Sequence, residues 1–499
     1  MAAAYVGRAT GLNVLQKEKH VDQHSHSHQC GCCMSMGRRD FLTVVGLSAL
    51  AVGPATFGLT AETPQPSSKP KIRVRFFRPD VKEYWMGWPG KSYDIAGHQA
   101  QYTQILMEAA AKRGVDLDID QTPVASIAQA NALIEQCVKA PCDGMVVCSM
   151  CLNTSWENIN QFVAKRPPEL PTIVFSPMGT SFTGHLAGTR NKPKTLVAAT
   201  QDQAWLAEAV HLFRVMHDMR QTRICIINGD KTLDQPLKTI GTTLHHIPLE
   251  RWVEEFAKAD RYPEAKGLAE QFAKTAKKTV EPKPEDVLNS AKNYYVAKKI
   301  MADENCQGIS LNCLGLIGSR RIPCPPCMAW LQLNDEGSVG CCECDWTAAI
   351  SLRLTALLCG RPGFMQDPCP NTVAGTLMGA HCSSPTKLRG FDKPGEPLIL
   401  RSHSESGLGV SPQVIWPLGE KATVMKFEGP ESMILGTGKV VSNIDTPPAG
   451  GCRTSVELEM DNVADPRDCK GFHQLFILGD VSRQFKNYCE LAGIKVVPV

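Results

Sequence analysis

From residue 71 to residue 221 the chain alternates short apolar runs with longer amphipathic stretches. Strands are predicted at residues 72–77, 117–119, 144–149 and 172–176, and helices at 92–113, 127–139 and 156–164. Strands that alternate with helices of this length favour a doubly wound parallel sheet. Residues 71–221 are therefore predicted to form an N-terminal α/β domain.

The alternation of strands and helices continues to about residue 361, and short strands predominate after it. A long helix at 203–219 leads to a strand at 223–230, helices at 249–273 (broken near Pro263) and 285–303, and a strand at 308–312. Beyond residue 362 the chain has short strands at 422–427, 438–441, 454–459 and 475–479, separated by Gly/Pro turns and closed by a helix at 483–491. This predicts a second doubly wound α/β domain over 222–361 and a β-rich, barrel-like C-terminal domain over 362–499.

Two carboxylates stand at the ends of predicted strands. Glu343 closes the apolar run 337–342, and Asp367 closes the run 363–366 after the helical run 346–358. A strand–helix–strand unit of this length suits parallel pairing, which predicts both carboxylates at the same sheet edge. Such carboxylates are hard oxygen ligands for Mg²⁺ or Mn²⁺. The alternative is two solvated loop acids.

The composition is that of a large globular chain. Its 499 residues are 43% hydrophobic, and 53 Lys and Arg oppose 50 Asp and Glu. This balance, without a basic run interleaved with aromatics, does not point to nucleic acid. After the N-terminal segment, no apolar stretch reaches the roughly 18 residues of a membrane span.

Residues 1–61 contain a segment that resembles a targeting signal. Gly37-Arg38-Arg39-Asp40 precedes a moderately apolar run at 43–53, which resembles a twin-arginine export signal with cleavage after Ala61. This predicts export to the periplasm by the twin-arginine machinery; an uncleaved signal would leave a membrane anchor, and an unused one a cytoplasmic protein. A His/Cys-rich tract upstream is interpreted as a low-complexity extension. Residues 62–70 are a Pro/Ser linker.

Cysteine is abundant, with 21 in the chain. One group surrounds the carboxylate segments and consists of Cys313, Cys324, Cys327, Cys341, Cys342, Cys344, Cys369 and Cys382. Cys324 and Cys327 form a C-x-x-C, but a second pair at zinc-ribbon spacing is missing. Core packing beside an active site and a redox or thiolate–metal role both remain open.

Four segments carry a family resemblance: 326–337 leading into 342–345, then 360–367, 379–382 and 471–480. Their order resembles the L-fucose isomerase-like family, related to L-arabinose isomerases, over about residues 70–499. The resemblance implies two α/β domains, a C-terminal β-barrel-type domain, a homo-oligomer and a divalent metal, typically Mn²⁺. It assigns Glu343 and Asp367, 24 residues apart, and His473 as the metal ligands.

The implied activity is aldose–ketose isomerisation of a small-molecule sugar through an enediol. A divalent cation chelated by two neighbouring sugar oxygens acts as a Lewis acid, and two carboxylates move the proton between adjacent carbons. Glu343 and Asp367 are the candidate catalytic groups. Which of them is the base and which the acid is open at this point.

Four residues are weaker candidates for substrate binding. His381 resembles a family position that lines the sugar pocket, and it could equally be a core histidine. Asn312, at a strand end, could donate to a sugar hydroxyl or serve as a cap. Arg78 and Trp88 follow the first strand at an edge where α/β sheets bind ligands, so they could reach a neighbouring subunit's site or simply pack.

Two other classes of function stay open. The family isomerases act in the cytoplasm, whereas this chain carries an export-like signal, and cysteines flank Glu343 on both sides. An exported, catalytically silent sugar- or metal-binding protein on the same scaffold is one alternative. A cysteine-rich redox or thiolate–metal protein that uses Cys324, Cys327 and their neighbours is the other.

Overall fold

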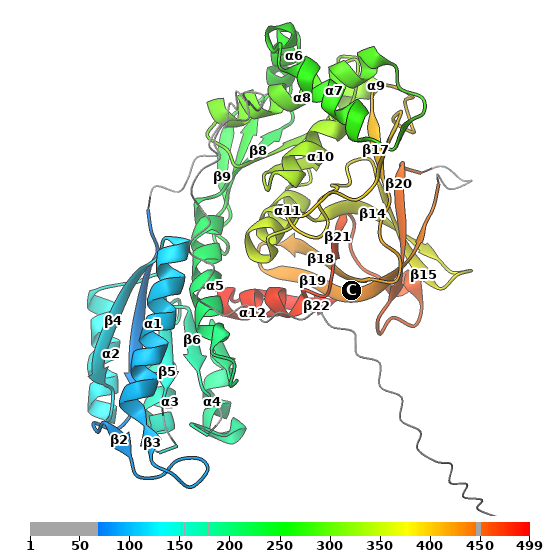
Figure 1. The fold of residues 1–499 in the computed structure, drawn as a ribbon. Helices are drawn as coiled ribbons and strands as arrows, with labels where there is room; N and C mark the ends of the chain where they lie inside the picture. The colour runs from blue at the N-terminus through cyan, green and yellow to red at the C-terminus, as the bar shows by residue number, and fades with distance from the viewer. Residues whose placement is uncertain (1–67, 151, 154, 178, 446–450) are drawn as a thin grey trace, which may run out of the picture. The chain divides into compact units, whose positions relative to one another are not determined.

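The computed structural model describes residues 68–150, 152–153, 155–177, 179–445 and 451–499. The twin-arginine-like segment, the His/Cys-rich tract and most of the 62–70 linker lie outside the described residues. Within the described part of the chain, no helix combines the length and the apolar character needed to cross a membrane. The described chain is a mixed α/β protein with parallel sheet and a closed antiparallel barrel (Figure 1).

The first sheet is parallel throughout, with the order β4-β1-β5-β6-β7. Its strands are β1 (Lys71–Phe77), β4 (Asp116–Pro123), β5 (Gly144–Ser149), β6 (Thr172–Phe175) and β7 (Thr195–Ala198). Its helices are α1 (Ile95–Arg113), α2 (Ile127–Lys139), α3 (Ser155–Lys165), α4 (Ala187–Arg190) and α5 (Ala204–Gln221), and a small hairpin joins β2 (Glu83–Tyr84) to β3 (Tyr93–Asp94).

Helices cover both faces of this sheet, because its strands are apolar on both sides. Ile72 and Val74 of β1 belong to one buried cluster with residues of α1 and α5. Met145 and Val147 of β5 belong to a different cluster with residues of α2 and α3. A parallel sheet covered on both faces is the arrangement that near-continuous apolar strands favour.

The second sheet has the order β13-β12-β8-β10-β9, and its edge strand β9 runs antiparallel to β10. Its strands are β8 (Arg223–Ile227), β9 (Leu233–Pro236), β10 (Thr243–Ile247), β12 (Gly308–Leu311) and β13 (Val339–Cys342). Its helices are α6 (Glu250–Phe256), α7 (Ala265–Thr275), α8 (Pro284–Asp303), α9 (Cys313–Gly318) and α10 (Cys327–Asp335). The expected break near Pro263 separates α6 from α7.

Six antiparallel strands form the closed barrel, in the order β18-β21-β14-β15-β20-β19, with a β18–β19 pairing that closes it. They are β14 (Phe364–Asn371), β15 (Thr376–His381), β18 (Lys421–Gly429), β19 (Ser432–Asn443), β20 (Thr454–Met460) and β21 (Gln474–Leu478). β22 (Lys495–Pro498) follows α12 (Ser482–Ala492) and joins β19 in parallel. A separate small sheet contains β11 (Lys278–Thr279), β16 (Leu398–Arg401) and β17 (Ser411–Val414).

The expected parallel pairing of the two carboxylate-bearing strands is wrong. β13 pairs with β12 in the second sheet, whereas β14 pairs antiparallel with β15 and β21 in the barrel. The reason lies in α11 (Trp346–Cys359), whose buried residues include Ala348, Ala349, Ile350, Leu352 and Leu354. A helix that is apolar around most of its circumference needs cover on more than one side.

α11 therefore lies between the second sheet and the barrel. On the barrel side, Ser351 Oγ accepts a 2.9 Å hydrogen bond from the backbone N–H of Phe427 in β18. The strand after α11 consequently enters the barrel instead of returning to the sheet. Glu343 and Asp367 both approach His473 at this junction.

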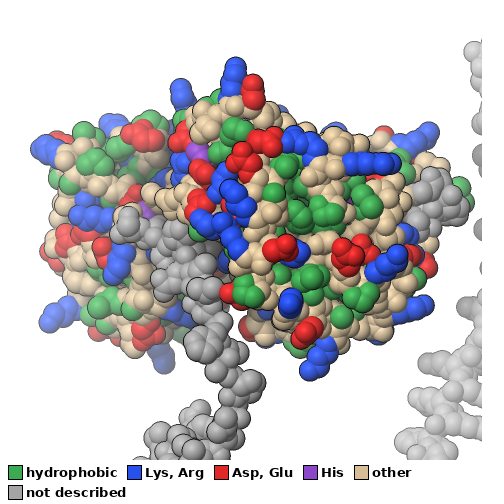
Figure 2. Space-filling view, turned by 90° about the horizontal axis from the view of Figure 1, so that it is seen from above, with side chains coloured by type: hydrophobic (Ala, Val, Ile, Leu, Met, Phe, Trp, Pro, Cys, Tyr) green, Lys and Arg blue, Asp and Glu red, His purple; other side chains and the backbone are tan. Residues whose placement is uncertain are grey.

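Charge is mixed on the surface. Figure 2 shows Lys and Arg side chains interspersed with Asp and Glu over the face seen from above. This distribution matches the nearly balanced composition, with a formal net charge of +3.

Gly340 fixes the position of β13 and offers a test of this packing. A Cβ at Gly340 would lie 2.7 Å from both Cα and Cε3 of Trp330 in α10. We expect Gly340→Ala to lower the free energy of unfolding by about 1–3 kcal/mol, because a backbone atom cannot move aside. The midpoint of urea unfolding is the measurement.

Gly267→Ala is the matched control. Gly267 lies in α7, and nothing stands within 4 Å of a Cβ built there. Alanine should raise stability at this position by up to roughly 1 kcal/mol, because glycine is a poor helix former. Equal unfolding midpoints for the two variants would contradict the packing described for β13.

Candidate metal centre between the second sheet and the barrel

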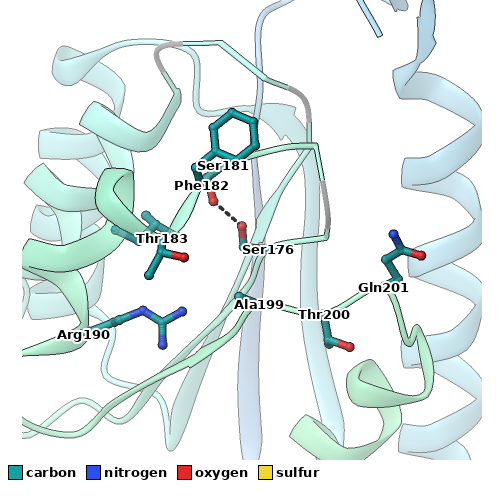
Figure 3. Close-up of a pocket in the computed structure, with 9 residues that line it drawn as sticks. Ser176, Ser181, Phe182, Thr183, Arg190, Ala199, Thr200 and Gln201 are labelled. Carbon is teal, nitrogen blue, oxygen red and sulfur yellow. Dashed lines mark hydrogen bonds between the residues drawn. The ribbon is translucent and has the colours of Figure 1, made fainter. Parts of the chain in front are cut away.

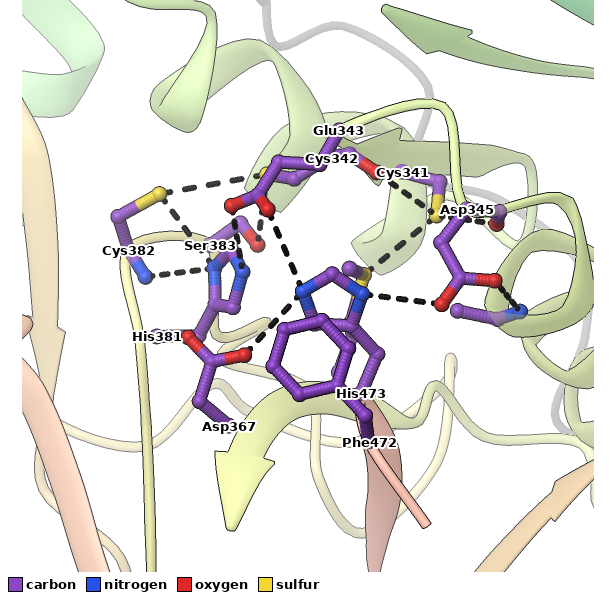
Figure 4. A network of polar contacts seen from close by, with 12 residues as sticks. Cys341, Cys342, Glu343, Asp345, Asp367, His381, Cys382, Ser383, Phe472 and His473 are labelled. Atoms are coloured by element: carbon purple, nitrogen blue, oxygen red, sulfur yellow. Dashed lines mark hydrogen bonds and ion pairs between the residues drawn. The ribbon is translucent and has the colours of Figure 1, made fainter. Parts of the chain in front are cut away.

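Four side chains from four separate chain segments converge at the junction of the second sheet and the barrel (Figure 4). Glu343 follows β13, Asp367 lies within β14, His381 ends β15, and His473 immediately precedes β21. We call these four residues the carboxylate–histidine centre.

Within the centre, the imidazole nitrogens lie close to the carboxylate oxygens. His473 Nε2 lies 3.2 Å from Asp367 Oδ1 and 3.5 Å from Glu343 Oε2. His381 Nε2 lies 3.6 Å from Glu343 Oε1. A ligand atom of each of Glu343, His381 and His473 lies within 4.8 Å of the other two, which is close enough to hold one metal ion.

Buried polar atoms in the centre lack aligned partners. Asp367 Oδ1, His381 Nε2 and His473 Nε2 are buried, and none of them makes a hydrogen bond to the described part of the chain. The 3.2 Å separation of Asp367 and His473 is an ion-pair distance without hydrogen-bond alignment. Leaving such a group unsatisfied costs about 1–3 kcal/mol. A cation and the oxygens of a bound ligand would satisfy all three atoms.

The hydrogen bonds made by the Nδ1 atoms of His473 and His381 show that the two imidazoles play different roles. His473 Nδ1 lies 2.9 Å from Asp345 Oδ2, so it donates to that carboxylate and its Nε2 is the atom available for a metal. His381 Nδ1 accepts a 2.9 Å hydrogen bond from the backbone N–H of Cys382. The neutral His381 ring therefore carries its proton on Nε2, which makes it a hydrogen-bond donor toward the centre. The donor set that fits a hard divalent cation is thus Glu343, Asp367 and His473.

The backbone is strained where the ligands attach. Glu343, Cys344 and His473 have φ values of +60°, +56° and +53°. A residue with a Cβ in this left-handed region costs about 1–2 kcal/mol. Three such positions beside one group of polar side chains are the kind of local strain that accumulates at functional sites.

Asp345 holds His473 in place through hydrogen bonds. Its carboxylate accepts a 2.7 Å hydrogen bond from Lys426 Nζ in β18, and it also caps α11 by accepting from the backbone N–H of Ala348 at 3.0 Å. Burial alone would raise the pKa of Asp345, but the bonds from His473 and Lys426 hold it well below the usual range. The ring of Phe472 covers His473 with centroids 3.9 Å apart.

Sequence reasoning missed the roles of Asp345 and Lys426. An Asp that directly precedes a helical run signals a helix cap, and this signal was available for Asp345 two residues after Glu343. Lys426 carried no comparable signal, because its contact with Asp345 spans 81 residues.

Of the four weaker candidates, only His381 belongs to the centre. Asn312 leaves β12 beside Glu343, since Leu311 pairs with Cys342, but its side chain caps α9 by accepting from Gly315 N at 3.1 Å. Arg78 holds the loop after β1 through Gln99 Oε1 at 2.5 Å and Pro79 O at 2.9 Å. Trp88, in the same region, is 65% exposed. Asn312 and Arg78 follow strands and Trp88 lies in the loop between β2 and β3; none of the three belongs to the carboxylate–histidine centre.

A second polar cavity lies at the carboxyl ends of β6 and β7. It has a volume of about 410 Å³ and is lined by hydroxyl groups and by Arg190 (Figure 3). Ser176, from the end of β6, hydrogen-bonds Ser181 on its wall. The residues that line it belong to the first sheet and its loops, and the carboxylate–histidine centre contributes none of them.

Comparison with known proteins gives little. No protein-family model matches the chain, and no curated protein matches it. One similar solved structure is described as "XylFII molecule": it has 12% identity and a TM-score of 0.17, over 51% of this chain and 86% of that chain. At this TM-score the likeness defines neither the fold nor the function of the chain.

Asp345→Asn tests the support of His473. Asparagine still caps a helix, so α11 should persist, but it loses the charge that orients the imidazole and strengthens it as a ligand. We expect the dissociation constant for Mn²⁺ to rise by about 10- to 100-fold. The loss of the free Mn²⁺ signal in electron paramagnetic resonance measures this. Asp94→Asn, which alters the cap of α1, is the control and should leave binding unchanged.

The dependence of metal binding on pH follows from His473. Burial alone would lower the pKa of this imidazole, but the carboxylates of Asp345, Asp367 and Glu343 raise it to about 10. A cation that binds Nε2 must therefore displace a proton at neutral pH, and Mn²⁺ affinity should fall as the pH falls. Calorimetry in two buffers of different ionisation enthalpy should show one proton released per cation. Proton release should vanish in His473→Asn and persist in His185→Asn, where the ring stacks on Trp156.

Proposed function

We propose that the chain is an aldose–ketose sugar isomerase that depends on a divalent metal and resembles the L-fucose isomerase-like family. The observation that supports this most strongly is the position of His473 Nε2, a buried atom without a hydrogen-bond partner among the described residues, at 3.2 Å from Asp367 Oδ1 and 3.5 Å from Glu343 Oε2. The order of motifs in the sequence supports the same family.

The donor set suits Mn²⁺, or another hard divalent cation such as Mg²⁺. Two carboxylate oxygens and one imidazole nitrogen leave positions of a six-coordinate ion for two sugar oxygens and water. When bound, the cation supplies Lewis-acid polarisation of the sugar's carbonyl and adjacent hydroxyl.

The protein groups supply proton transfer and orientation. The imidazoles of His381 and His473, which face its two oxygens at 3.6 and 3.5 Å, hold the pKa of Glu343 well below its usual range, so this carboxylate is ionised and can accept a proton. One carboxylate takes the proton from the carbon beside the carbonyl, and a carboxylate returns it to the neighbouring carbon. His381 Nε2–H donates to a substrate oxygen. The side chains of Asp367 and Glu343 are 41% and 28% exposed, which leaves a small sugar access to both.

The wider organisation is part of the proposal. The resemblance supports domains at 71–221, 222–361 and 362–499, each built around one of the sheets or the barrel. It also supports a homo-oligomer in which Arg78 and Trp88 reach a neighbouring subunit's centre. The twin-arginine-like segment supports export of a chain that folds, and loads its metal, before it crosses the membrane.

Turnover of a panel of aldoses with Mn²⁺ in D₂O tests the activity. Ketose formation with deuterium at the carbon next to the carbonyl is expected, because the abstracted proton exchanges with solvent on a carboxylate. Glu343→Gln and Asp367→Asn should each lower the rate by at least about 10²–10⁴-fold, the size of a general acid–base contribution. Proton nuclear magnetic resonance follows both product and label.

Glu336→Gln is the matched control. Glu336 stands just before β13, but its carboxylate accepts from Tyr294 Oη at 2.9 Å, so this variant should keep its turnover. Full turnover in both Glu343→Gln and Asp367→Asn would exclude the proton-transfer role. Sugar-dependent thermal stabilisation without any ketose or deuterium would identify a silent binder instead.

A further inference from the structure

Three buried thiols and one imidazole gather beside the strand ends that carry the carboxylate–histidine centre. The Sγ atoms of Cys327 and Cys382 and a ring nitrogen of His403 all lie within 4.8 Å of one another. Cys342 Sγ lies 4.0 Å from Cys382 Sγ (Figure 4). We call Cys327, Cys342, Cys382 and His403 the thiol–imidazole cluster.

The cluster is closed to solvent. Cys327, Cys342, Cys382 and His403 are 2%, 1%, 6% and 3% exposed. Burial lowers the pKa of His403, so its ring is neutral and can offer a lone pair to a metal. The reaction proposed for the carboxylate–histidine centre makes no use of these four groups.

We propose that the thiol–imidazole cluster is a structural site for a borderline or soft cation, Zn²⁺ or Cu⁺. Tetrahedral zinc with Zn–S bonds of about 2.3 Å places its sulfur ligands about 3.8 Å apart. The 4.0 Å between Cys342 and Cys382 is close to that spacing. Cys327, Cys382 and His403 already lie within ligand distance of one another, and Cys342 stands beside Cys382. A shift of Cys342 toward them would complete a buried Cys₃His set, the donor type of a closed structural zinc site.

The proton balance of binding is simple. Three thiols give up their protons to solvent, and their three sulfurs and the neutral His403 nitrogen bind the cation. The contact with Cys382 lowers the pKa of the Cys327 thiol, but burial and the neighbouring thiols raise it to about 11, so without a cation that group stays protonated at neutral pH.

His381 is not the nitrogen ligand of this site. Its Nδ1 lies 3.5 Å from Cys382 Sγ, but that atom already accepts the backbone N–H of Cys382. Cys324 is not a ligand either, since its Sγ accepts a hydrogen bond from Asn293 Nδ2 at 3.2 Å. The C-x-x-C therefore contributes Cys327 alone, and the remaining ligands come from strand ends distant in sequence.

The two groups would sort metals by donor type. Hard Mn²⁺ prefers the oxygen-rich centre, and Zn²⁺ or Cu⁺ prefers the sulfur-rich cluster. Cys342 and Glu343 are neighbours, as are His381 and Cys382, so a cation on the thiols would brace the same two strand ends that present the carboxylate–histidine centre.

The first experiment uses the wild-type, full-length chain and identifies the atoms that bind zinc. Protein purified under reducing conditions and reconstituted with Zn²⁺ should show sulfur in the first shell of zinc by X-ray absorption. Substitution with Co²⁺ should give a sulfur-to-cobalt charge-transfer band. A zinc shell of oxygen and nitrogen alone would overturn the proposal, and so would a Cys342–Cys382 disulfide in the reduced, reconstituted protein.

Variants locate the ligands. Cys327→Ser and Cys382→Ser should lose the charge-transfer band, whereas Cys324→Ser, in the same motif and equally buried, should keep it. A band that survives both Cys327→Ser and Cys382→Ser overturns the assignment. If these variants do not fold, the wild-type zinc shell decides alone. Glu343→Gln separates this inference from the isomerase proposal, since it should abolish turnover and leave the band intact.

Discussion

The hydrogen bond between Asp345 and His473 is the contact on which the rest of the site depends. It joins the segment after β13 of the second sheet to the residue before β21 of the barrel, 128 positions along the chain. Lys426 reinforces it from a third element, β18, so the carboxylate is held by two cations and the imidazole keeps one orientation. Without it, the charges around His473 would have no fixed geometry relative to the barrel.

This fixed geometry has an unfavourable local free energy, which apolar packing elsewhere offsets. Left-handed backbone at Glu343 and His473, together with buried atoms that lack partners, opposes folding. The opposing term is apolar burial around α11, which is covered by the second sheet on one side and the barrel on the other. Rigid elements on both sides give a metal centre the precision that loops alone do not provide. Glu343 and His473 lie at strand ends, where the backbone can deviate without disrupting a sheet.

The sequence predicted the individual helices and strands better than it predicted which strands pair with each other. Apolar runs such as β1 and β5 and helices such as α8 follow from periodicity, and the breaker Pro263 does separate two helices. Periodicity is local, however, so it could not show that β14 leaves the second sheet for the barrel, or that β9 adds an antiparallel edge. The carboxylates and His473 were identified through motif order, whereas the contact of Lys426 with Asp345 depends on a tertiary arrangement that no local pattern encodes. For the same reason the thiols were grouped by nearness in sequence, which joins Cys324 to Cys327, whereas the fold brings Cys382 beside Cys327.

Adjacent residues at two strand ends carry opposite chemistry, with Cys342 next to Glu343 and His381 next to Cys382. Because successive side chains of a strand point to opposite faces, a slip of one residue in either strand would exchange an oxygen or nitrogen donor for a sulfur. Inserting or deleting a single residue within either strand would thus disturb both groups of side chains at once. The register of these two strands is therefore constrained by two different groups of side chains.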